Sequence, residues 1–278
     1  MKGTVAVQLT NGFGNNIFQY TAGRLLAEFL QSDLMLIPPS KDYYAIPDLE
    51  LLGMDFTKKD LTNQIKIVDK HYKSCYNNIL KDKDIILSGY FEDYTIYYDH
   101  IDRIKSWFPH VPKRDSRDLT IHLRTGDRLF MKNEFYSKPR AFNYLRAIKK
   151  FDFDHMHIVT DMPVWDYITE EQLGNMKFHI DVPKNERVPL SESVKYFNEF
   201  VEEFKPFTPT IKQRTIVEDF NFLRGSRNIL FEHGTLSWWA SALSDAEKVG
   251  VYGPWRPWKG SKNKNLSNIP LENWFQWE

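Results

Sequence analysis

Residues 4–30, TVAVQLTNGFGNNIFQYTAGRLLAEFL, carry the succession of signals that decides the fold. The run at 4–9 is apolar and β-branched, which is typical of a buried strand. The loop after it contains Gly12 and Gly14, and beyond the loop apolar residues recur at helical spacing. Strand, glycine turn and helix in this order predict the opening of a parallel α/β unit.

Strands and helices alternate in the same way along the rest of the chain. Further strands are predicted at the apolar runs 34–37, 65–68, 85–91, 119–124, 155–160, 177–180, 228–233 and 248–252. Helices are predicted over 93–108, 141–151, 194–204 and 236–244, and after Pro163. The polar segment 184–216, which contains the helix 194–204, is predicted to be an inserted helical flap. A mostly parallel sheet binds ligands beyond the carboxyl ends of its strands, so motifs at strand ends matter most.

A proline and a burst of charge in VPKRDSRD, at 111–118, interrupt this pattern. We therefore predict an N-terminal Rossmann-like domain over 1–115 and a C-terminal one over 116–278. The last residues are rich in tryptophan and proline and are expected to pack back on the first domain.

Composition excludes several kinds of protein. The 278 residues contain 37 basic and 37 acidic side chains, and a zero formal net charge disfavours nucleic acid as a partner. Cys75 is the only cysteine, which excludes an intramolecular disulfide and indicates a reducing, cytoplasmic location. No apolar stretch approaches the length of a membrane span, so none is expected.

The loop at 11–16, NGFGNN, is the first candidate site. Its glycines allow a tight turn and a close approach to a ligand, and the helix that begins there favours negative charge. The alternative is a purely structural turn in which Asn15 caps the helix.

The second candidate lies at the end of the strand 119–124. His122 and Arg124 share one face by the alternation of a strand, and an arginine fork suits a diphosphate. Gly126 would let the phosphates come close. The alternative is an ion pair between Arg124 and Asp127, with His122 as a core histidine.

Two further strand ends carry polar residues. Asp161 could accept hydrogen bonds from a ribose or base, or could cap a helix before Pro163. Gly234, Thr235 and Ser237 open a helix whose N–H groups and hydroxyls suit a phosphate. The alternative for Thr235 is a plain N-cap.

Together these segments resemble the α-1,2-fucosyltransferase family. The motifs of that family match, in the same order, residues 12–20, 122–127, 160–165, 219–220 and 235–240. The resemblance implies a GT-B-like fold, two Rossmann-like domains facing a central cleft. It implies an inverting transfer from a nucleotide-sugar donor, held by the C-terminal domain, to a hydroxyl of a glycan acceptor on the N-terminal side. No cofactor and no essential metal are expected.

Residue roles follow from the resemblance by position. It implies that Arg124 holds the donor diphosphate and, with Asp127 and Asn15, is catalytic. The donor-binding residues that it implies are Gly12, Gly14, His122, Arg124, Asp161, Thr235 and Ser237.

The chain departs from the family motifs at several positions, among them Thr125 in place of a second arginine, Arg128 in place of a tyrosine and Asn16 in place of a glutamine. His233 and Gly234 replace an asparagine and a serine. GDP-fucose is the expected donor, and another donor such as UDP-xylose or GDP-rhamnose is the alternative. Arg128 or Arg224 could replace the missing charge if the geometry permits.

The sequence does not identify the catalytic base, and it is compatible with two other functions. Spacing does not distinguish the candidate bases Asp93, Asp127, Glu232 and His233. A metal-dependent transferase would use an Asp-x-Asp pair, which 152–154 matches. A non-catalytic carbohydrate-binding protein would use a platform of C-terminal tryptophans, Trp255, Trp258, Trp274 and Trp277.

Overall fold

The computed structural model describes residues 3–62, 64–76, 80–124, 140–160, 188–211, 214–232, 234–252 and 271–277. The chain forms two compact α/β units. Unit 1 contains the chain as far as Val111 together with Thr235–Leu243, and unit 2 contains Pro112–Gly234 and the chain from Ser244 to Tyr252 and from 271 to 277. The main division lies close to the boundary predicted at residue 115.

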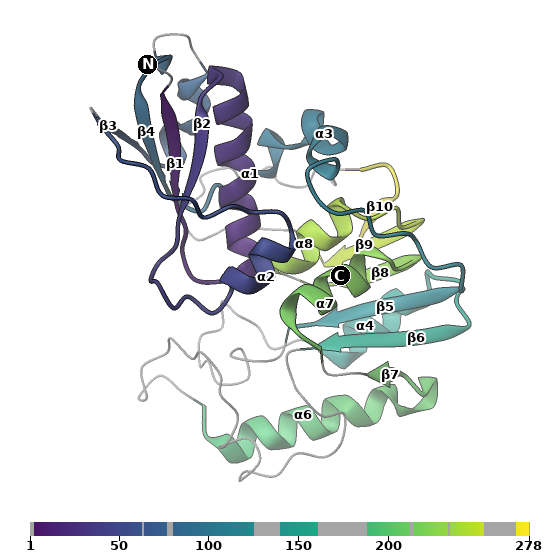
Figure 1. The fold of residues 1–278 in the computed structure, drawn as a ribbon. Coiled ribbons are helices and arrows are strands. Elements are labelled where there is room, and N and C mark those ends of the chain that lie inside the picture. The colour runs from purple at the N-terminus through teal and green to yellow at the C-terminus, as the bar shows by residue number, and fades with distance from the viewer. Residues whose placement is uncertain are drawn as a thin grey trace. The chain divides into compact units, whose positions relative to one another are not determined.

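The sheet of unit 1 has four parallel strands, β1 (Thr4–Gln8), β2 (Asp33–Ile37), β3 (Gln64–Ile67) and β4 (Asp84–Ser88), in the order β2-β1-β4-β3. Helix α1 (Phe13–Leu30) connects β1 to β2 and packs along the sheet (Figure 1). Strand β2 pairs with one side of β1 and β4 with the other, and β3 pairs with the outer side of β4. The switch point of this sheet, where ligands bind in open α/β folds, therefore lies between β1 and β4.

The remaining helices of unit 1 are short. They are α2 (Ile46–Leu51), α3 (Ile101–Lys105), α8 (Thr235–Ala242) and the 3₁₀ helices η1 (Asp69–Cys75), η3 (Tyr94–Ile96) and η4 (Tyr98–His100). The single helix predicted over 93–108 is wrong, because this segment forms η3, η4 and α3 in succession. The Asp93 carboxylate accepts a hydrogen bond from the Thr95 N–H and tightens the first turn, and the Tyr97 hydroxyl donates to the Phe91 carbonyl 2.6 Å away.

The sheet of unit 2 has six parallel strands, β5 (Asp118–Leu123), β6 (His155–Thr160), β7 (Thr210–Ile211), β8 (Asn228–Phe231), β9 (Lys248–Tyr252) and β10 (Trp274–Trp277). Their order is β10-β9-β8-β5-β6-β7, which is the 6-5-4-1-2-3 order of the Rossmann fold. Its switch point lies between β5 and β8. The two parallel sheets confirm the predicted class of two Rossmann-like α/β domains; the central cleft stays a prediction.

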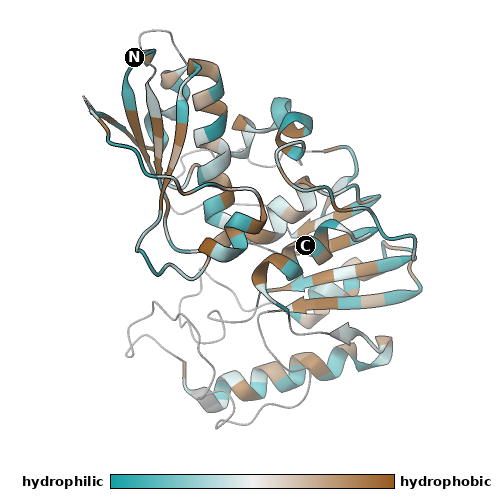
Figure 2. Ribbon diagram, viewed as in Figure 1, coloured by the Kyte–Doolittle hydropathy of each residue, from teal (hydrophilic) through white to brown (hydrophobic). Residues whose placement is uncertain are grey.

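Four helices of unit 2 are described, α4 (Ala141–Ile148), α6 (Leu190–Phe204), η7 (Lys205–Phe207) and α7 (Ile216–Arg224). Helix α6 is banded with hydrophobic and hydrophilic residues (Figure 2). Its side chains Phe200 and Phe204 are buried in the core of unit 2, with ring centroids 6.1 and 6.3 Å from that of Tyr144. It is therefore a packed part of the core and not the flap that the sequence suggested.

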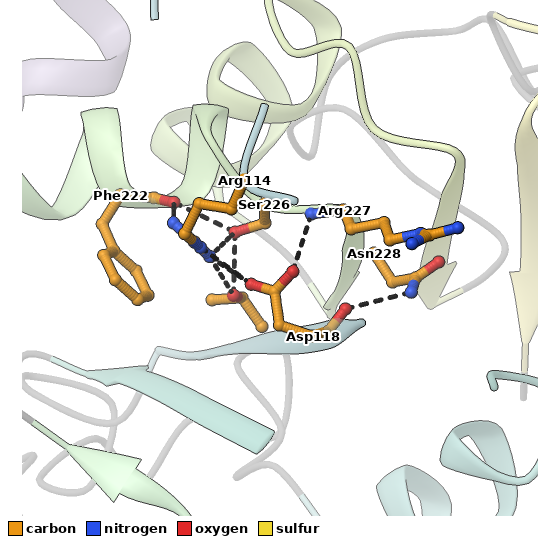
Figure 3. A network of polar contacts seen from close by, with 7 residues as sticks. Arg114, Asp118, Phe222, Ser226, Arg227 and Asn228 are labelled. Carbon is orange, nitrogen blue, oxygen red and sulfur yellow. Dashed lines mark hydrogen bonds and ion pairs between the residues drawn. The ribbon is translucent and has the colours of Figure 1, made fainter. Parts of the chain in front are cut away.

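The amino end of β5 is closed by a network of polar side chains (Figure 3). The Asp118 carboxylate is fully buried, accepts a hydrogen bond from Arg114 Nε at 2.9 Å, and accepts another from the Arg227 N–H at 3.1 Å. Arg114 also donates to the Phe222 carbonyl and to Ser226 Oγ, both at 2.8 Å. The network joins the beginnings of β5 and β8 to the end of α7.

The last described residues extend the second sheet. Strand β10 pairs in parallel with β9, and Trp274 and Trp277 are buried. These residues belong to unit 2, whereas the sequence placed the tail on the first domain; residues 253–270 of the tail lie outside the described residues. Among the helices that the structure describes, none has the length and apolar character that crossing a membrane requires.

Candidate functional site at the switch points

In unit 2, the site predicted at the end of β5 lies at the switch point. His122 is in register with Phe231 of β8, so the residues that follow the two strands, Arg124 and Glu232, leave the sheet at the same edge. His122 and Glu232 are buried, whereas Arg124 is partly exposed. Of these three described residues, Arg124 is therefore the charged one that a ligand in solution can reach.

Arg224 cannot stand in for a missing arginine at this edge. It ends α7 and precedes β8, so it lies by the amino ends of the strands, whereas Arg124 follows the carboxyl end of β5. Because each strand residue advances the chain by about 3.3 Å, the length of β5 separates the two. Arg224 Nη1 donates to Asn221 Oδ1 at 3.1 Å, and burial, opposed by nearby Asp245, lowers its pKa to about 10.

The Asp-x-Asp pair of a metal-dependent transferase also lies at the wrong edge. Asp152 and Asp154 precede β6, and Arg117 forms ion pairs with both. The side chain of Asp152 is 86% exposed, so nothing holds it for a metal. Within the described residues, no group of three or more His, Cys, Asp and Glu side chains could hold a metal ion.

In unit 1, a buried hydrogen-bond network fixes the glycine loop at the switch point. Asn16 Nδ2 donates to the Thr10 carbonyl at 2.8 Å, and Gln19 Nε2 donates to the Gly89 carbonyl at 2.7 Å. The Tyr43 hydroxyl donates to Asn16 Oδ1 at 2.8 Å and accepts a hydrogen bond from the Gly12 N–H at 3.0 Å. These bonds tie the loop after β1 to the segment after β4.

The sequence pattern did not reveal this network, because Asn16 and Gln19 face inward from a helix and their partners are distant in sequence. Burial raises the pKa of Tyr43 well above its ordinary value, so its hydroxyl stays protonated and keeps both bonds. Gly12 has a φ of +102°, which a residue with a side chain rarely adopts. The loop is therefore held in one conformation by backbone and side chains together.

Helix α8 packs on α1 with the two N-termini side by side (Figure 1). Thr235 Oγ1 donates to Asn15 Oδ1 at 2.9 Å, and a Cβ on Gly14 would lie 2.3 Å from the Leu236 nitrogen. Further along, the Phe18 ring lies 5.1 Å from Trp238 and 5.0 Å from Trp239, so the contact continues beyond the N-termini of the two helices. Gly14 is required here by the close approach of the two backbones.

The adjacent N-termini of α1 and α8 place two positive dipole ends together, which favours an anion at that point. Neither helix has an acidic residue in its first turn. The sequence grouped Thr235 and Ser237 with His122 and Arg124, but the contacts join Thr235 to Asn15 in unit 1. Ser237 is fully buried in α8.

Other predicted site residues remain without a structural description. Those outside the described residues are Thr125, Gly126, Asp127, Arg128, Asp161, Trp165 and His233. The strand predicted at 177–180 and the helix predicted after Pro163 also lie outside them, as do Trp255 and Trp258. The roles assigned to Asp127 and Asp161 stay predictions.

Of the candidate bases, Asp93 and Glu232 are described. The Asp93 carboxylate caps η3 and forms an ion pair with Lys73 at 2.8 Å, so it is engaged in structure. Glu232 is buried next to Tyr196 of α6, whose pKa is raised mainly by burial and further by the Glu232 charge. A base must be reachable and must have a carboxylate oxygen that can take a proton. Buried Glu232 and engaged Asp93 do not meet both conditions.

The tryptophan platform of a carbohydrate-binding protein is not present at residues 274–277. Trp277 packs with its ring centroid 4.9 Å from those of Tyr144 and Tyr252, and Trp274 lies 5.9 Å from Phe231. Both side chains are buried core residues and cannot stack on a sugar.

Neither a protein-family model nor a curated protein matches the sequence. Among solved structures, the chain is similar to a mutant of Arabidopsis thaliana FUT1 in complex with GDP, at 9% identity and a TM-score of 0.49, over 91% of this chain and 71% of that one. It is also similar to NodZ α-1,6-fucosyltransferase soaked with GDP-fucose, at 10% identity and a TM-score of 0.37, over 90% of this chain and 94% of that one. The selenomethionine form of the fucosyltransferase NodZ from Bradyrhizobium gives a TM-score of 0.39 at 10% identity, with the same coverage of both chains. A likeness at this level carries no argument about activity.

The contact between α1 and α8 predicts the effect of Gly14→Ala. In an isolated helix this change stabilises by up to about 1 kcal/mol, but here the added methyl collides with the backbone of α8. We expect a loss of about 2–3 kcal/mol in the free energy of unfolding. Thermal denaturation followed by near-UV circular dichroism should show a fall in Tm of roughly 4–12 °C.

Gly53→Ala is the matched control for this collision. Gly53, unlike Gly14, has a positive φ, +85°, but a Cβ there would lie 4.0 Å from its nearest neighbour, the Trp107 carbonyl oxygen. Its cost should be limited to about 1 kcal/mol of backbone strain. A Gly14→Ala protein as stable as the wild type would contradict the close packing of α8 on α1.

Proposed function

We propose that the protein is a glycosyltransferase that moves a sugar from a nucleotide-diphosphate donor to a hydroxyl of a glycan acceptor, with inversion at the anomeric carbon. The observation that carries this proposal is the position of Arg124. It follows β5 at the switch point of a sheet with Rossmann strand order, the place where such folds bind nucleotides, and it is partly exposed.

In this proposal Arg124 binds the donor diphosphate through its planar fork of N–H donors. His122, which is buried at the end of the same strand, helps to position the nucleotide. Asp161 and Asp127, which follow β6 and β5 in the sequence, are proposed to contact the nucleotide and to assist the reaction.

The acceptor is assigned to the switch point of unit 1, where Gly12, Gly14 and Asn15 border the transferred sugar. The fixed glycine loop and the paired N-termini of α1 and α8 support this assignment. The acceptor oxygen attacks the anomeric carbon, and the bond from that carbon to the diphosphate oxygen breaks with its electron pair on the diphosphate. Arg124 stabilises the charge that develops there.

GDP-fucose is the proposed donor, because the motif at 122–127 and the loop at 12–20 resemble those of α-1,2-fucosyltransferases. Thr125, where the family motif has a second arginine, keeps UDP-xylose and GDP-rhamnose as alternatives. Transfer without an essential metal and a cytoplasmic location stay predictions.

The test is a turnover assay that measures release of the free nucleotide from a panel of GDP- and UDP-sugars, with a panel of oligosaccharide acceptors, in the presence of EDTA. We expect acceptor-dependent release of GDP from GDP-fucose. Acceptor-dependent release from a UDP-sugar would replace the donor and leave the class of enzyme intact. Failure with every donor, with and without added Mg²⁺ or Mn²⁺, would refute the proposal.

A further inference from the structure

The segment that follows β4, residues 89–93, leaves the sheet of unit 1 at its switch point, next to the glycine loop after β1. The hydrogen bond from Gln19 to the Gly89 carbonyl ties the two segments together. Asp93 of this segment is one of the candidate bases predicted from the sequence, and its neighbour Glu92 is not.

The backbone just before Glu92 is held in a strained conformation. Phe91 has a φ of +55°, in the left-handed region, which is unfavourable for a residue with a bulky side chain. Three contacts impose it. The Phe91 N–H donates to Asp69 Oδ1 at 2.6 Å, its carbonyl accepts from the Tyr97 hydroxyl at 2.6 Å, and its buried ring lies 5.3 Å from that of Tyr72. The direction in which the chain presents Glu92 is therefore built into the fold.

The Asp69 carboxylate lies close to this segment. It accepts hydrogen bonds from the Phe91 N–H and, at 3.3 Å, from the Tyr90 N–H. It fits only because residue 89 is glycine, since a Cβ there would lie 2.5 Å from Asp69 Oδ2. The Asp69 carboxylate is thus fixed in position at the base of the segment.

The carboxyl group of Glu92 makes no polar contact with the side chains or backbone of the described residues. It forms no hydrogen bond or ion pair with them, in contrast to Asp69 and Asp93, whose oxygens are engaged. Glu92 is partly exposed, so a ligand can reach it. Burial, and then the charge of Asp69, raise its pKa to about 7.

We propose that Glu92 is the general base that accepts the proton of the acceptor hydroxyl during sugar transfer. This inference rests on the proposed function. As the acceptor oxygen forms its bond to the anomeric carbon, its proton passes to a Glu92 carboxylate oxygen, and the electron pair of the broken bond leaves with the diphosphate. The proton returns to water after the glycoside departs.

A base with a pKa near the working pH combines a useful ionised fraction with basicity. Asp69 acts electrostatically on Glu92, and Glu92 acts on Tyr97, while the adjacent Asp93 is paired with Lys73. Tyr97 is fully buried and its pKa is raised well above its ordinary value, so it does not titrate near neutral pH. The turnover number should therefore fall as the pH drops through about 7, where Glu92 gains its proton.

The test compares Glu92→Gln with the wild type by calorimetry of donor binding and by turnover from pH 5 to 9. The variant should fold, because glutamine has nearly the same shape. A carboxyl whose folded pKa is raised from 4.5 to about 7 weakens stability as the pH rises between those values, so the glutamine variant should be at least as stable at pH 8. Asp99→Asn, an exposed carboxylate ten residues after Gly89, is the matched control.

We expect Glu92→Gln to bind the donor as the wild type does, to lose roughly 100- to 10,000-fold in kcat, and to lose the pH dependence near 7. Asp99→Asn should keep the wild-type rate. A Glu92→Gln enzyme with the wild-type kcat, or one that loses only donor affinity, would overturn the assignment of the base and leave the proposed function standing. A wild type that transfers from no nucleotide sugar would overturn both.

Discussion

Arg124→Ala is expected to lower kcat/KM for the donor by roughly 100- to 1,000-fold, because it removes the charged fork that stabilises the leaving diphosphate. The affinity for the free nucleoside diphosphate should fall with it. Calorimetry and the nucleotide-release assay measure the two quantities. The folded state should change little, because Arg124 is partly exposed and lies one residue beyond the end of β5.

Arg117→Ala is the matched control, at the opposite end of the same strand. Arg117 lies one residue before β5, and its side chain is 44% exposed in ion pairs with Asp152 and Asp154. Its loss should leave donor affinity and turnover unchanged. Arg124→Lys keeps the charge without the fork and should recover part of the activity. If Arg124→Ala and Arg117→Ala behave alike, Arg124 does not bind the donor.

Asp118→Ala is expected to lower the free energy of unfolding by about 3–5 kcal/mol. The change leaves the Arg114 guanidinium in the network of Figure 3 without its counter-ion, and it leaves the Arg227 N–H without its acceptor. Urea denaturation followed by tryptophan fluorescence measures the loss. The protein that remains folded should bind the donor with wild-type affinity, because the network lies at the amino end of β5.

Asp152→Ala is the control for this second prediction. Asp152 also pairs with an arginine next to β5, but its side chain is 86% exposed, and such pairs contribute about 1 kcal/mol or less. A similar loss from both variants would mean that the buried network stabilises the fold no more than a surface pair does. The donor site is assigned to the carboxyl end of β5, away from this network. Loss of donor affinity in folded Asp118→Ala protein would contradict that assignment.

Most strands were predictable because each is a short apolar run that ends at polar or glycine residues, as in β1, β2 and β6. Strand β10 was missed because its apolar residues are aromatic and lie in a segment with no regular alternation. The segment 93–108 was mispredicted because its apolar positions fit a helix, while the contacts of Asp93 and Tyr97 with neighbouring residues tighten it into 3₁₀ turns. Neither apolar runs nor helical spacing predicts the order of the strands, because that order depends on pairing between residues far apart in sequence.

The candidate site was predictable only where its residues are close in sequence. The position of His122 and Arg124 at a strand end could be read from the run 119–124. The contact of Asn15 with Thr235 could not, because 220 positions separate the two residues. Glu92 gave no sequence signal, because its environment is made by Asp69 and by the backbone of Phe91, and an isolated glutamate in a loop is usually a surface charge.

The central claim is that the carboxyl edge of β5 and β8 binds a nucleoside diphosphate, and isothermal titration calorimetry of GDP and UDP with the purified protein in EDTA tests it most directly. The account predicts saturable binding of one GDP per chain that EDTA does not weaken, with weaker binding of UDP, and loss of that binding in Arg124→Ala. Absence of binding for both nucleotides, with EDTA or with added Mg²⁺, would contradict it.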